Sequence, residues 1–392
     1  MNNLDDGRLN LKDHKWLTLP AREFERYRLN SGDLLFNRTN SKERVGKCAV
    51  FREEGDWVFA SYLIRVRVDA DRVAPEFVAA FLASPSGRAQ VDRDSRQIIG
   101  MANINSSELR GFLIPLPSLS KQRRFVKPVD SSREALAMAR ASSKHTDSMI
   151  NRILLDRLDV AVRDPDGLHT FSVSTSSLRG QRLDALAHVP VLQLRKGRPS
   201  SRVAQLGEVA KINPKRAAPQ DNQGLVPYVG LPECSQRRIE RIEMRDATGP
   251  IGRNVAINGD ILFARIEPSV FNRKYVMVRN MATHDRVLTS AEFFVLQPDA
   301  NVVDSTYLHE VLLSDIIAQQ IVGKTTGSSG RRRLDRIVLE ALMIPLPNVQ
   351  AQKNIASELQ QIRRKTEKTQ ASAEAAWRDA MSKFELSLFP SP

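Results

Sequence analysis

Two stretches of the chain concentrate arginine, lysine and asparagine side chains directly after the same short pattern. The pattern is Gly-Asp followed by three apolar residues, at 32–36 and again at 259–263. Arginine and asparagine present paired hydrogen-bonding groups that match guanine and adenine edges, while lysine suits phosphates. The stretches therefore predict DNA contacts. The candidate residues are Asn37, Arg38, Thr39, Asn40, Lys42, Arg44 and Lys47 after the first pattern, and Arg265, Arg273 and Lys274 after the second.

A third candidate is the loop 324–333, which contains two glycines and ends in three consecutive arginines. Glycine permits close backbone approach, and hydroxyl and amide groups can bond phosphate. The segment 96–103 occupies the matching place in the first half of the chain. For any single residue, a solvated basic loop is the simpler explanation. Each stretch taken as a whole favours contact with DNA. The candidates here are Lys324, Ser328, Ser329, Arg331, Arg332 and Arg333.

The overall charge agrees with a polyanionic partner. The 392 residues include 59 Lys and Arg against 45 Asp and Glu, for a formal net charge of +14. Each basic side chain that neutralises a phosphate releases a condensed counterion, and this release favours binding. Many soluble proteins are basic for other reasons, so charge alone leaves both possibilities open.

The sequence predicts no catalytic or metal site. Gly323-Lys324-Thr325 resembles the end of a phosphate-binding loop, but the earlier glycine is replaced by Ala318 and the segment follows a helical stretch. The two cysteines are far apart and the six histidines lack metal-ligand spacing. No apolar run approaches the roughly 20 residues of a membrane-spanning helix. A polar, acidic start without a signal peptide predicts a cytoplasmic protein with no membrane partner.

The chain contains an internal duplication. The Gly-Asp pattern recurs 227 residues later, and Ile-Pro-Leu-Pro at 114–117 recurs 230 residues later, as does Gln122. Several ordered matches at nearly constant offset indicate two diverged copies of one domain. Each copy is expected to hold strands near the Gly-Asp turn, then a helical stretch (76–82 and 307–321), a polar loop and a proline-rich strand end.

A long helical pattern follows each copy. Apolar or small residues alternate at spacings of four and three along 125–153 and, in matching positions, along 355–380. This heptad spacing favours an antiparallel coiled coil over two unrelated surface helices. The predicted fold class is α+β, with two globular mixed α/β domains joined by two long helices. The expected boundaries are 1–118 for the first domain, 119–163 for the first helix, 164–347 for a linker and the second domain, and 348–390 for the second helix.

Taken together, these segments resemble the specificity subunits of type I restriction–modification systems. The resemblance implies two target recognition domains that each read half of a bipartite DNA site, with the helices as spacer. It implies double-stranded DNA and two modification subunits as partners, with S-adenosylmethionine bound by those subunits and no cofactor bound by this chain. Restriction subunits can join such a complex. The matching segments are 32–41, 45–47, 59–65, 102–105, 261–268 and both Ile-Pro-Leu-Pro-to-Gln runs.

Two departures from the family pattern stand out. Leu206-Gly207-Glu208-Val209-Ala210 is similar to the family's domain opening, and its counterpart in the first copy would fall before Met1. The first domain is therefore expected to lack its opening segment. Ser120-Lys121-Gln122 also lacks the glutamate that usually precedes the glutamine. Two other functions stay open: a non-catalytic scaffold assembled through the paired helices, and a DNA-reading subunit of another methylation-linked defence system.

Overall fold

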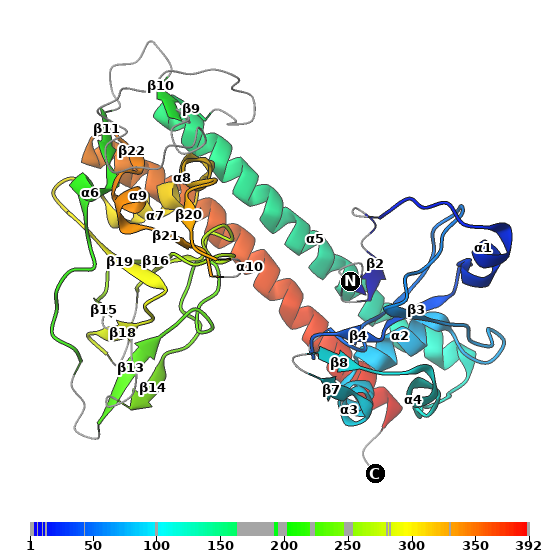
Figure 1. Ribbon diagram of the computed structural model, residues 1–392. Coiled ribbons are helices and arrows are strands. Elements are labelled where there is room, and N and C mark those ends of the chain that lie inside the picture. Colours follow the sequence, from blue (N-terminus) through cyan, green and yellow to red (C-terminus); the bar gives the residue numbers. More distant parts are fainter. Residues whose placement is uncertain are drawn as a thin grey trace. The chain divides into compact units, whose positions relative to one another are not determined.

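The computed structural model describes residues 4–5, 7–9, 11, 14–42, 44–98, 101–162, 192–194, 202–219, 224–246, 254–279, 281, 284–328 and 331–389. The chain forms two compact units (Figure 1). Unit 1 comprises Met1–Lys144 and Thr366–Pro392, and unit 2 comprises His145–Lys365. Ser329 lies outside the described residues, as does most of 164–198, the start of the range 164–347 predicted to hold a linker and the second domain.

Unit 1 is built on two small antiparallel sheets with helices packed against them. The first sheet has the order β5-β3-β6 and the second the order β4-β8-β7. Strand β3 is buried throughout because Leu34 and Phe36 face one apolar cluster while Leu35 faces another. The elements are β1 (Leu4–Asp5), β2 (Arg8–Leu9), α1 (Ala21–Tyr27), β3 (Leu34–Asn37), β4 (Thr39–Asn40), β5 (Cys48–Val50), β6 (Leu63–Val66), α2 (Pro75–Ala83), α3 (Pro85–Asp94), β7 (Arg96–Ile98), β8 (Met101–Asn103) and α4 (Ser106–Arg110).

Unit 2 has two four-stranded sheets, ordered β12-β19-β16-β17 and β14-β13-β18-β15. The first of them is apolar on both faces, so that Ile261 and Phe263 of β16 enter one core and Leu262 enters another. The strands are β9 (Val160–Val162), β10 (Leu192–Leu194), β11 (Arg202–Gln205), β12 (Ala210–Ile212), β13 (Leu225–Val229), β14 (Glu243–Asp246), β15 (Asn254–Ala256), β16 (Ile261–Ala264), β17 (Tyr275–Met277), β18 (Val287–Thr289), β19 (Phe293–Pro298), β20 (Thr325–Thr326), β21 (Arg333–Leu334) and β22 (Met343–Leu346). The short helices are α6 (Leu206–Val209), α7 (Ser305–Leu312), α8 (Asp315–Ile321) and α9 (Arg336–Glu340).

Both units repeat the element order that the sequence predicts around the Gly-Asp turn. Gly32 and Gly259 both adopt a φ of +93°, a conformation that L side chains rarely adopt. The adjacent carboxylates are buried and accept hydrogen bonds from nearby backbone N–H groups, Asp33 from Asn30 and Asp260 from Ile257, both at 2.9 Å. The Gly-Asp pair therefore fixes the turn that starts the central strand of each unit.

Three predicted elements differ from the structure. The helix predicted over 307–321 is two helices, α7 and α8, because Ser314 caps the second by accepting a hydrogen bond from the Ile316 N–H at 3.2 Å. The first long helix ends at Leu158 and not at 163, since Asp159 takes a positive φ of 54° and β-branched residues of β9 follow. The proline-rich segment is a strand, β22, in unit 2 but not in unit 1, where 114–117 has no strand partner among the described residues.

Gln122 and Gln352 anchor the start of a long helix in each unit. Both are fully buried, and their side chains make equivalent hydrogen bonds. Gln122 accepts from the Ala74 N–H at 2.8 Å and donates to the Pro117 and Arg72 carbonyls at 2.7 and 3.0 Å. Gln352 accepts from the Asp304 N–H at 2.8 Å and donates to the Pro347 and Val302 carbonyls at 2.8 and 3.1 Å. The repeated glutamine is thus a structural tie between the proline-rich segment and the helix.

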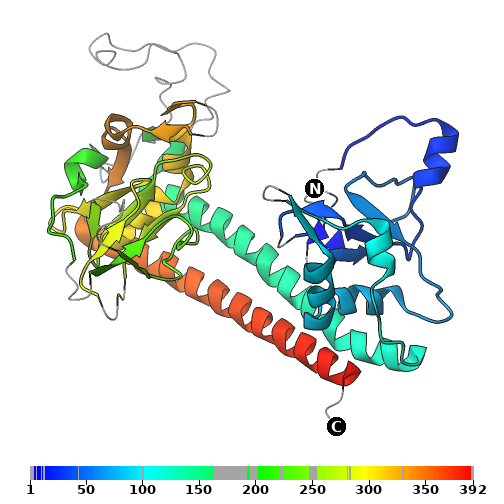
Figure 2. The same ribbon diagram turned by 60° about the horizontal axis from the view of Figure 1, so that its bottom comes forward.

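The long helices α5 (Leu119–Leu158) and α10 (Val349–Leu388) lie side by side and antiparallel within each unit (Figures 1 and 2). In unit 2, Leu154 and Leu158 share a core with Ile355 and Leu359. In unit 1, the helices meet through a second set, Val126, Val129, Ala380, Met381 and Phe384. Of the predicted contact positions in α10, Thr369 and Ala376 are exposed. No helix in the described ranges is both long and apolar enough to cross a membrane.

His309 gives unit 2 a predicted pH dependence. Its ring is buried on α7, with Nε2 2.8 Å from the Tyr275 carbonyl, and burial lowers its pKa from 6.5 to about 4. The folded state therefore disfavours protonation, whereas the unfolded state binds the proton near pH 6.5. We expect the free energy of unfolding to fall by about 3 kcal/mol as the pH drops from 6.5 to 4. Urea denaturation of wild type and His309→Gln tests this, and identical pH profiles for the two would contradict it.

Candidate nucleic-acid interface

Arg38 and Arg265 occupy the same place in the two units, one residue beyond the central strand. A neighbouring backbone segment fixes the position of each: the Arg38 N–H donates to the Tyr62 carbonyl at 3.0 Å, and the Arg265 N–H donates to the Glu292 carbonyl at 2.9 Å. Both residues are half-buried, and in both the Nε atom is buried without a hydrogen-bond partner in the described structure. The Arg265 guanidinium lies 4.6 Å from the centre of the Phe294 ring, which holds it in place. A half-buried arginine stacked in this way is suited to an external acceptor, although its buried Nε cannot make that contact.

In unit 2 the basic loop is a hairpin docked beside Arg265. Strands β20 and β21 pair across it, the Leu334 N–H donates to the Arg265 carbonyl at 2.7 Å, and the Glu267 N–H donates to Arg332 at 2.9 Å. The structure therefore brings together the predicted residues on both sides of this contact. They are Arg265, Lys324, Ser328, Arg331, Arg332 and Arg333.

Acidic residues offset part of the hairpin's charge. Arg333 makes a two-pronged ion pair with Glu292, with N···O distances of 2.9 and 2.5 Å. Arg332 lies 3.5 Å from Glu267. Arg331 and Ser328 are exposed at the hairpin end, and Arg331 has no ion pair within the described part of unit 2. Arg331 is thus the hairpin arginine best placed to meet phosphate or base, while Arg332 and Arg333 also hold the hairpin against Glu267 and Glu292.

Unit 1 repeats this arrangement of strand end and hairpin with fewer basic residues. Strand β4, which contains Thr39 and Asn40, pairs with β8, and β8 pairs with β7 as the hairpin counterpart. Lys42 and Arg44 are exposed in the following turn. The turn is held by Arg88 of α3, whose Nη1 donates to the Val45 carbonyl at 2.6 Å. The residues just beyond the end of β3 are thus held together in β4 and the turn that follows it. They are Arg38, Thr39, Asn40, Lys42 and Arg44.

Four of the residues predicted to contact DNA do not lie on the exposed surface beside these hairpins. Asn37 is only 1% exposed and is therefore a core residue of β3, because the strand stays buried to its last position. Lys47 is half-buried beside β5. Arg273 and Lys274 are turned into unit 2, where Arg273 Nη1 donates to the Leu313 carbonyl and Lys274 Nζ to the Leu231 carbonyl, both at 2.8 Å. These last two stabilise unit 2 and are not brought together with the hairpin.

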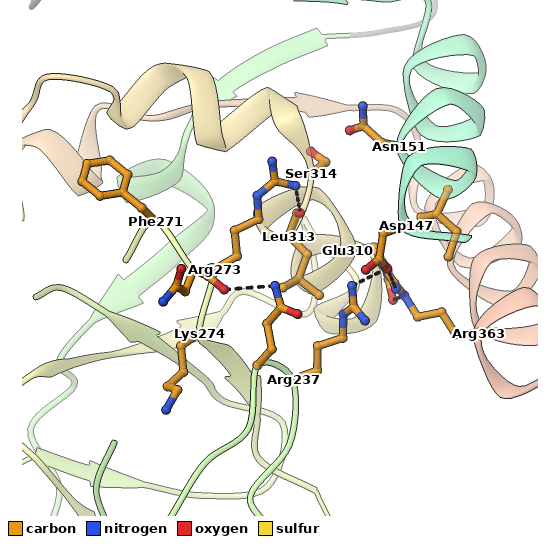
Figure 3. A pocket seen from close by; sticks show the side chains of 13 residues that line it. Asp147, Asn151, Arg237, Phe271, Arg273, Lys274, Glu310, Leu313, Ser314 and Arg363 are labelled. Carbon is orange, nitrogen blue, oxygen red and sulfur yellow. Dashed lines mark hydrogen bonds and ion pairs between the residues drawn. The ribbon is translucent and has the colours of Figure 1, made fainter. Parts of the chain in front are cut away.

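Arg273 and Lys274 line a cavity of about 500 Å³ whose charged wall the sequence does not reveal (Figure 3). Arg363 of α10 donates to Glu310 of α7 through Nε and Nη2 at 2.9 and 2.7 Å, and to Asp147 of α5 through Nη1 at 2.8 Å. Arg237 donates to the same Asp147 at 2.5 Å, and burial lowers the pKa of Arg237. The cluster ties both long helices to the unit-2 domain. Its members are separated by up to 216 positions in sequence, so no local pattern signals it.

Residues 201–375 match the family described as "Type I restriction modification DNA specificity domain". This range contains the whole unit-2 hairpin and Arg265. The chain is 27% identical over 150 residues to the type I restriction enzyme EcoKI specificity subunit of Escherichia coli K12, covering 38% of this chain and 32% of that protein. It is 26% identical over 106 residues to the putative type I restriction enzyme MjaX specificity subunit of Methanocaldococcus jannaschii, covering 27% and 25%. The alignments thus span about a third or less of these relatives' own length.

Solved structures with a similar trace include two specificity subunits. The HsdS subunit from Thermoanaerobacter tengcongensis is 16% identical, with a TM-score of 0.37 and coverage of 93% of this chain and 82% of that one. The type I restriction–modification S subunit from M. genitalium is 13% identical, with a TM-score of 0.45 and coverage of 94% and 85%. Residues 201–375 thus match a type I restriction–modification DNA specificity domain, and part of the chain is similar to curated specificity subunits.

Proposed function

We propose that the chain is the non-catalytic, DNA-reading subunit of a type I restriction–modification complex. The observation that carries the proposal is the arginine hairpin docked beside Arg265 within the DNA specificity domain of unit 2. Unit 1 supports it, because Arg38 and the β4-β8-β7 sheet occupy the equivalent place. Each unit would present its strand end and hairpin to one half of a bipartite double-stranded site.

The long helices would act as the spacer between the two reading units. Within each unit α5 and α10 are antiparallel and share a core, which supports a coiled coil that continues from one unit to the other. Such a spacer would set the separation of the two half-sites. It would also offer a docking surface for two modification subunits, with restriction subunits joining them.

Catalysis would belong to the partners. S-adenosylmethionine would be bound by the modification subunits, which would methylate adenine in the site that this chain selects, in the cytoplasm. The chain's own part is recognition: the half-buried arginines would read base edges, and exposed Lys42, Arg44 and Arg331 would contact phosphates.

A gel-shift titration of the full chain with its modification partner tests this function. Duplex DNA from the host genome would be titrated at about 50 and 200 mM salt, with and without unrelated competitor. We expect binding that survives competitor on a subset of fragments and weakens steeply with salt, by about a thousandfold for a protein that neutralises six phosphates. Loss of all binding under competitor would favour a scaffold that does not read DNA. Methyl transfer by the purified chain alone would contradict the non-catalytic assignment.

A further inference from the structure

The ion pair between Arg333 and Glu292 in unit 2 is held in place and still accessible. Arg333 donates through Nε to Glu292 Oε2 at 2.9 Å and through Nη2 to Oε1 at 2.5 Å. Both residues lie on backbone that is hydrogen-bonded to its neighbours, because β21 pairs with β20 and the Glu292 carbonyl accepts from the Arg265 N–H. The side chains of Arg333 and Glu292 remain 38% and 25% exposed. The pair is thus a positioned charged group that a ligand at the surface can reach.

The ion pair leaves Arg333 with hydrogen-bond donors for a further ligand. A guanidinium group carries one N–H on Nε and two on each terminal nitrogen. Nε and one N–H of Nη2 are used on Glu292, and one N–H of Nη1 is used on the Arg331 carbonyl at 3.2 Å. No other acceptor in the described part of unit 2 bonds these nitrogens, so each terminal nitrogen retains one N–H. Two such donors match the O6 and N7 acceptors of guanine in the major groove.

Glu292 supplies acceptors next to these donors. A carboxylate accepts hydrogen bonds and suits the N4 amino group of cytosine. Arg333 is the only side chain in the described residues that bonds the Glu292 carboxylate, which leaves lone pairs on it available. A G·C base pair presents guanine O6 and N7 beside the cytosine amino group in the major groove. The Arg333–Glu292 pair therefore matches the acceptors and donor of one G·C base pair.

Phosphate is a poorer ligand for the same pair. The Glu292 carboxylate offsets the charge of Arg333, and a phosphate brought to Arg333 would lie close to that carboxylate. Like charges at short range repel, and the repulsion would oppose the contact. The pair therefore favours a base edge over the DNA backbone, and base contacts are the ones that carry sequence information.

Unit 1 holds neutral residues at the same two positions. Tyr62 takes the place of Glu292, since the carbonyls of both accept from the arginine that follows the central strand. Asn103 takes the place of Arg333, since both lie opposite the residue after that arginine. The two units thus repeat one backbone frame and differ in the side chains that it presents.

We propose that Arg333 and Glu292 together determine the specificity of unit 2 by reading a G·C base pair in the major groove of its half-site. This inference rests on the proposed function, because it requires that unit 2 reads DNA. Arg333 would donate to guanine, while Glu292 orients Arg333 and accepts from cytosine. Without the carboxylate, Arg333 would bind phosphate as readily as guanine, so sequence discrimination should fall more than affinity. Unit 1, with Tyr62 and Asn103, would not share this preference.

Selection from a randomised duplex library by the full chain with its modification partner tests the inference. We expect wild type to enrich two sequence blocks, and the block that Arg265→Ala relaxes should contain a G·C pair that Glu292→Gln no longer requires. The other block should be unchanged in Glu292→Gln. Glu340→Gln is the matched control, because it removes a carboxylate from an exposed ion pair with Arg336 on α9. It should leave both blocks unchanged.

Binding to the selected site gives the size of the effect. Replacing the G·C pair with A·T should weaken wild-type binding by about tenfold to one hundredfold, and binding by Glu292→Gln by less than about threefold. The base analogue 7-deazaguanine lacks the N7 acceptor. At that position it should weaken binding by wild type and leave binding by Arg333→Ala unchanged.

The outcomes separate this inference from the proposed function. If wild type enriches two blocks and Glu292→Gln alters neither, the inference is overturned while the proposed function stands. If wild type enriches no sequence, the proposed function fails and the inference fails with it. Relaxation at the G·C pair alone supports the assignment. Relaxation of the whole block would show that Glu292→Gln disturbs the hairpin, and equal sensitivity of wild type and Arg333→Ala to 7-deazaguanine would show that another residue reads the guanine; either result overturns it.

Discussion

Replacing Arg265 with alanine is expected to lower affinity for the specific DNA site by about tenfold to one hundredfold, which corresponds to about 1–3 kcal/mol. Its guanidinium is held 4.6 Å from the Phe294 ring centre, and its Nε has no hydrogen-bond partner in the described structure. Because the Phe294 ring holds this half-buried arginine, its remaining N–H groups would offer a base edge a pre-positioned donor, whereas the buried Nε would not. Binding of matched and mismatched duplexes by the full chain measures the effect, which should be larger on the matched duplex.

Two companion variants make this result specific. Arg38→Ala should produce an effect of the same order, confined to the other half of the site, because Arg38 holds the equivalent place in unit 1. Arg378→Ala removes the same charge from an exposed position on α10 and should change affinity little. If all three variants lost affinity equally on matched and mismatched DNA, Arg265 would contribute only general charge.

Replacing Arg363 with alanine is expected to lower the free energy of unfolding by about 3–5 kcal/mol. Arg363 is 11% exposed and its principal partner, Glu310, only 5%. The substitution would leave the Glu310 carboxylate buried without its cation, and an unpaired buried charge is costly. Urea denaturation gives the measurement, and a loss below about 1 kcal/mol would show that water or rearrangement replaces the ion pair.

The double variant Arg363→Met with Glu310→Leu is the matched control. Removing both charges leaves no buried carboxylate to solvate, so most of the lost stability should return. Because Arg363 also contacts Asp147 on α5, the double variant tests in addition whether helix pairing in unit 2 depends on that second contact. Recovery of less than half the loss would indicate that it does.

Local patterns in the sequence were sufficient for much of this fold. The Gly-Asp turn and the two long helices follow from short motifs whose geometry is set nearby, by a positive φ or a heptad spacing. The repeat also singled out Gln122 and Gln352, although their buried hydrogen bonds reach residues 48 to 50 positions away. The repeat also located the strand ends at Arg38 and Arg265. The sequence predicts the segment 324–333 only as a basic loop, and not its pairing as β20 and β21.

Long-range partners could not be predicted from the sequence. Asn37 is polar and of a type usually found at the surface. It is nevertheless buried, because β3 is buried along its whole length. Arg273 and Lys274 are basic residues that follow the Gly-Asp strand in sequence, as Arg265 does, but their direction depends on carbonyl acceptors about 40 positions away. The proline-rich segment becomes a strand only where β11 pairs with it, so identical sequences at 114–117 and 344–347 adopt different structures.

Selection from a randomised duplex DNA library by the full chain and its modification partner tests the central claim most directly. The proposed function, in which each unit reads DNA and the long helices act as spacer, predicts enrichment of two short sequence blocks separated by a spacer of fixed length without sequence preference. Arg38→Ala should relax one block and Arg265→Ala the other. A single uninterrupted block, or no enriched sequence at all, would contradict the account.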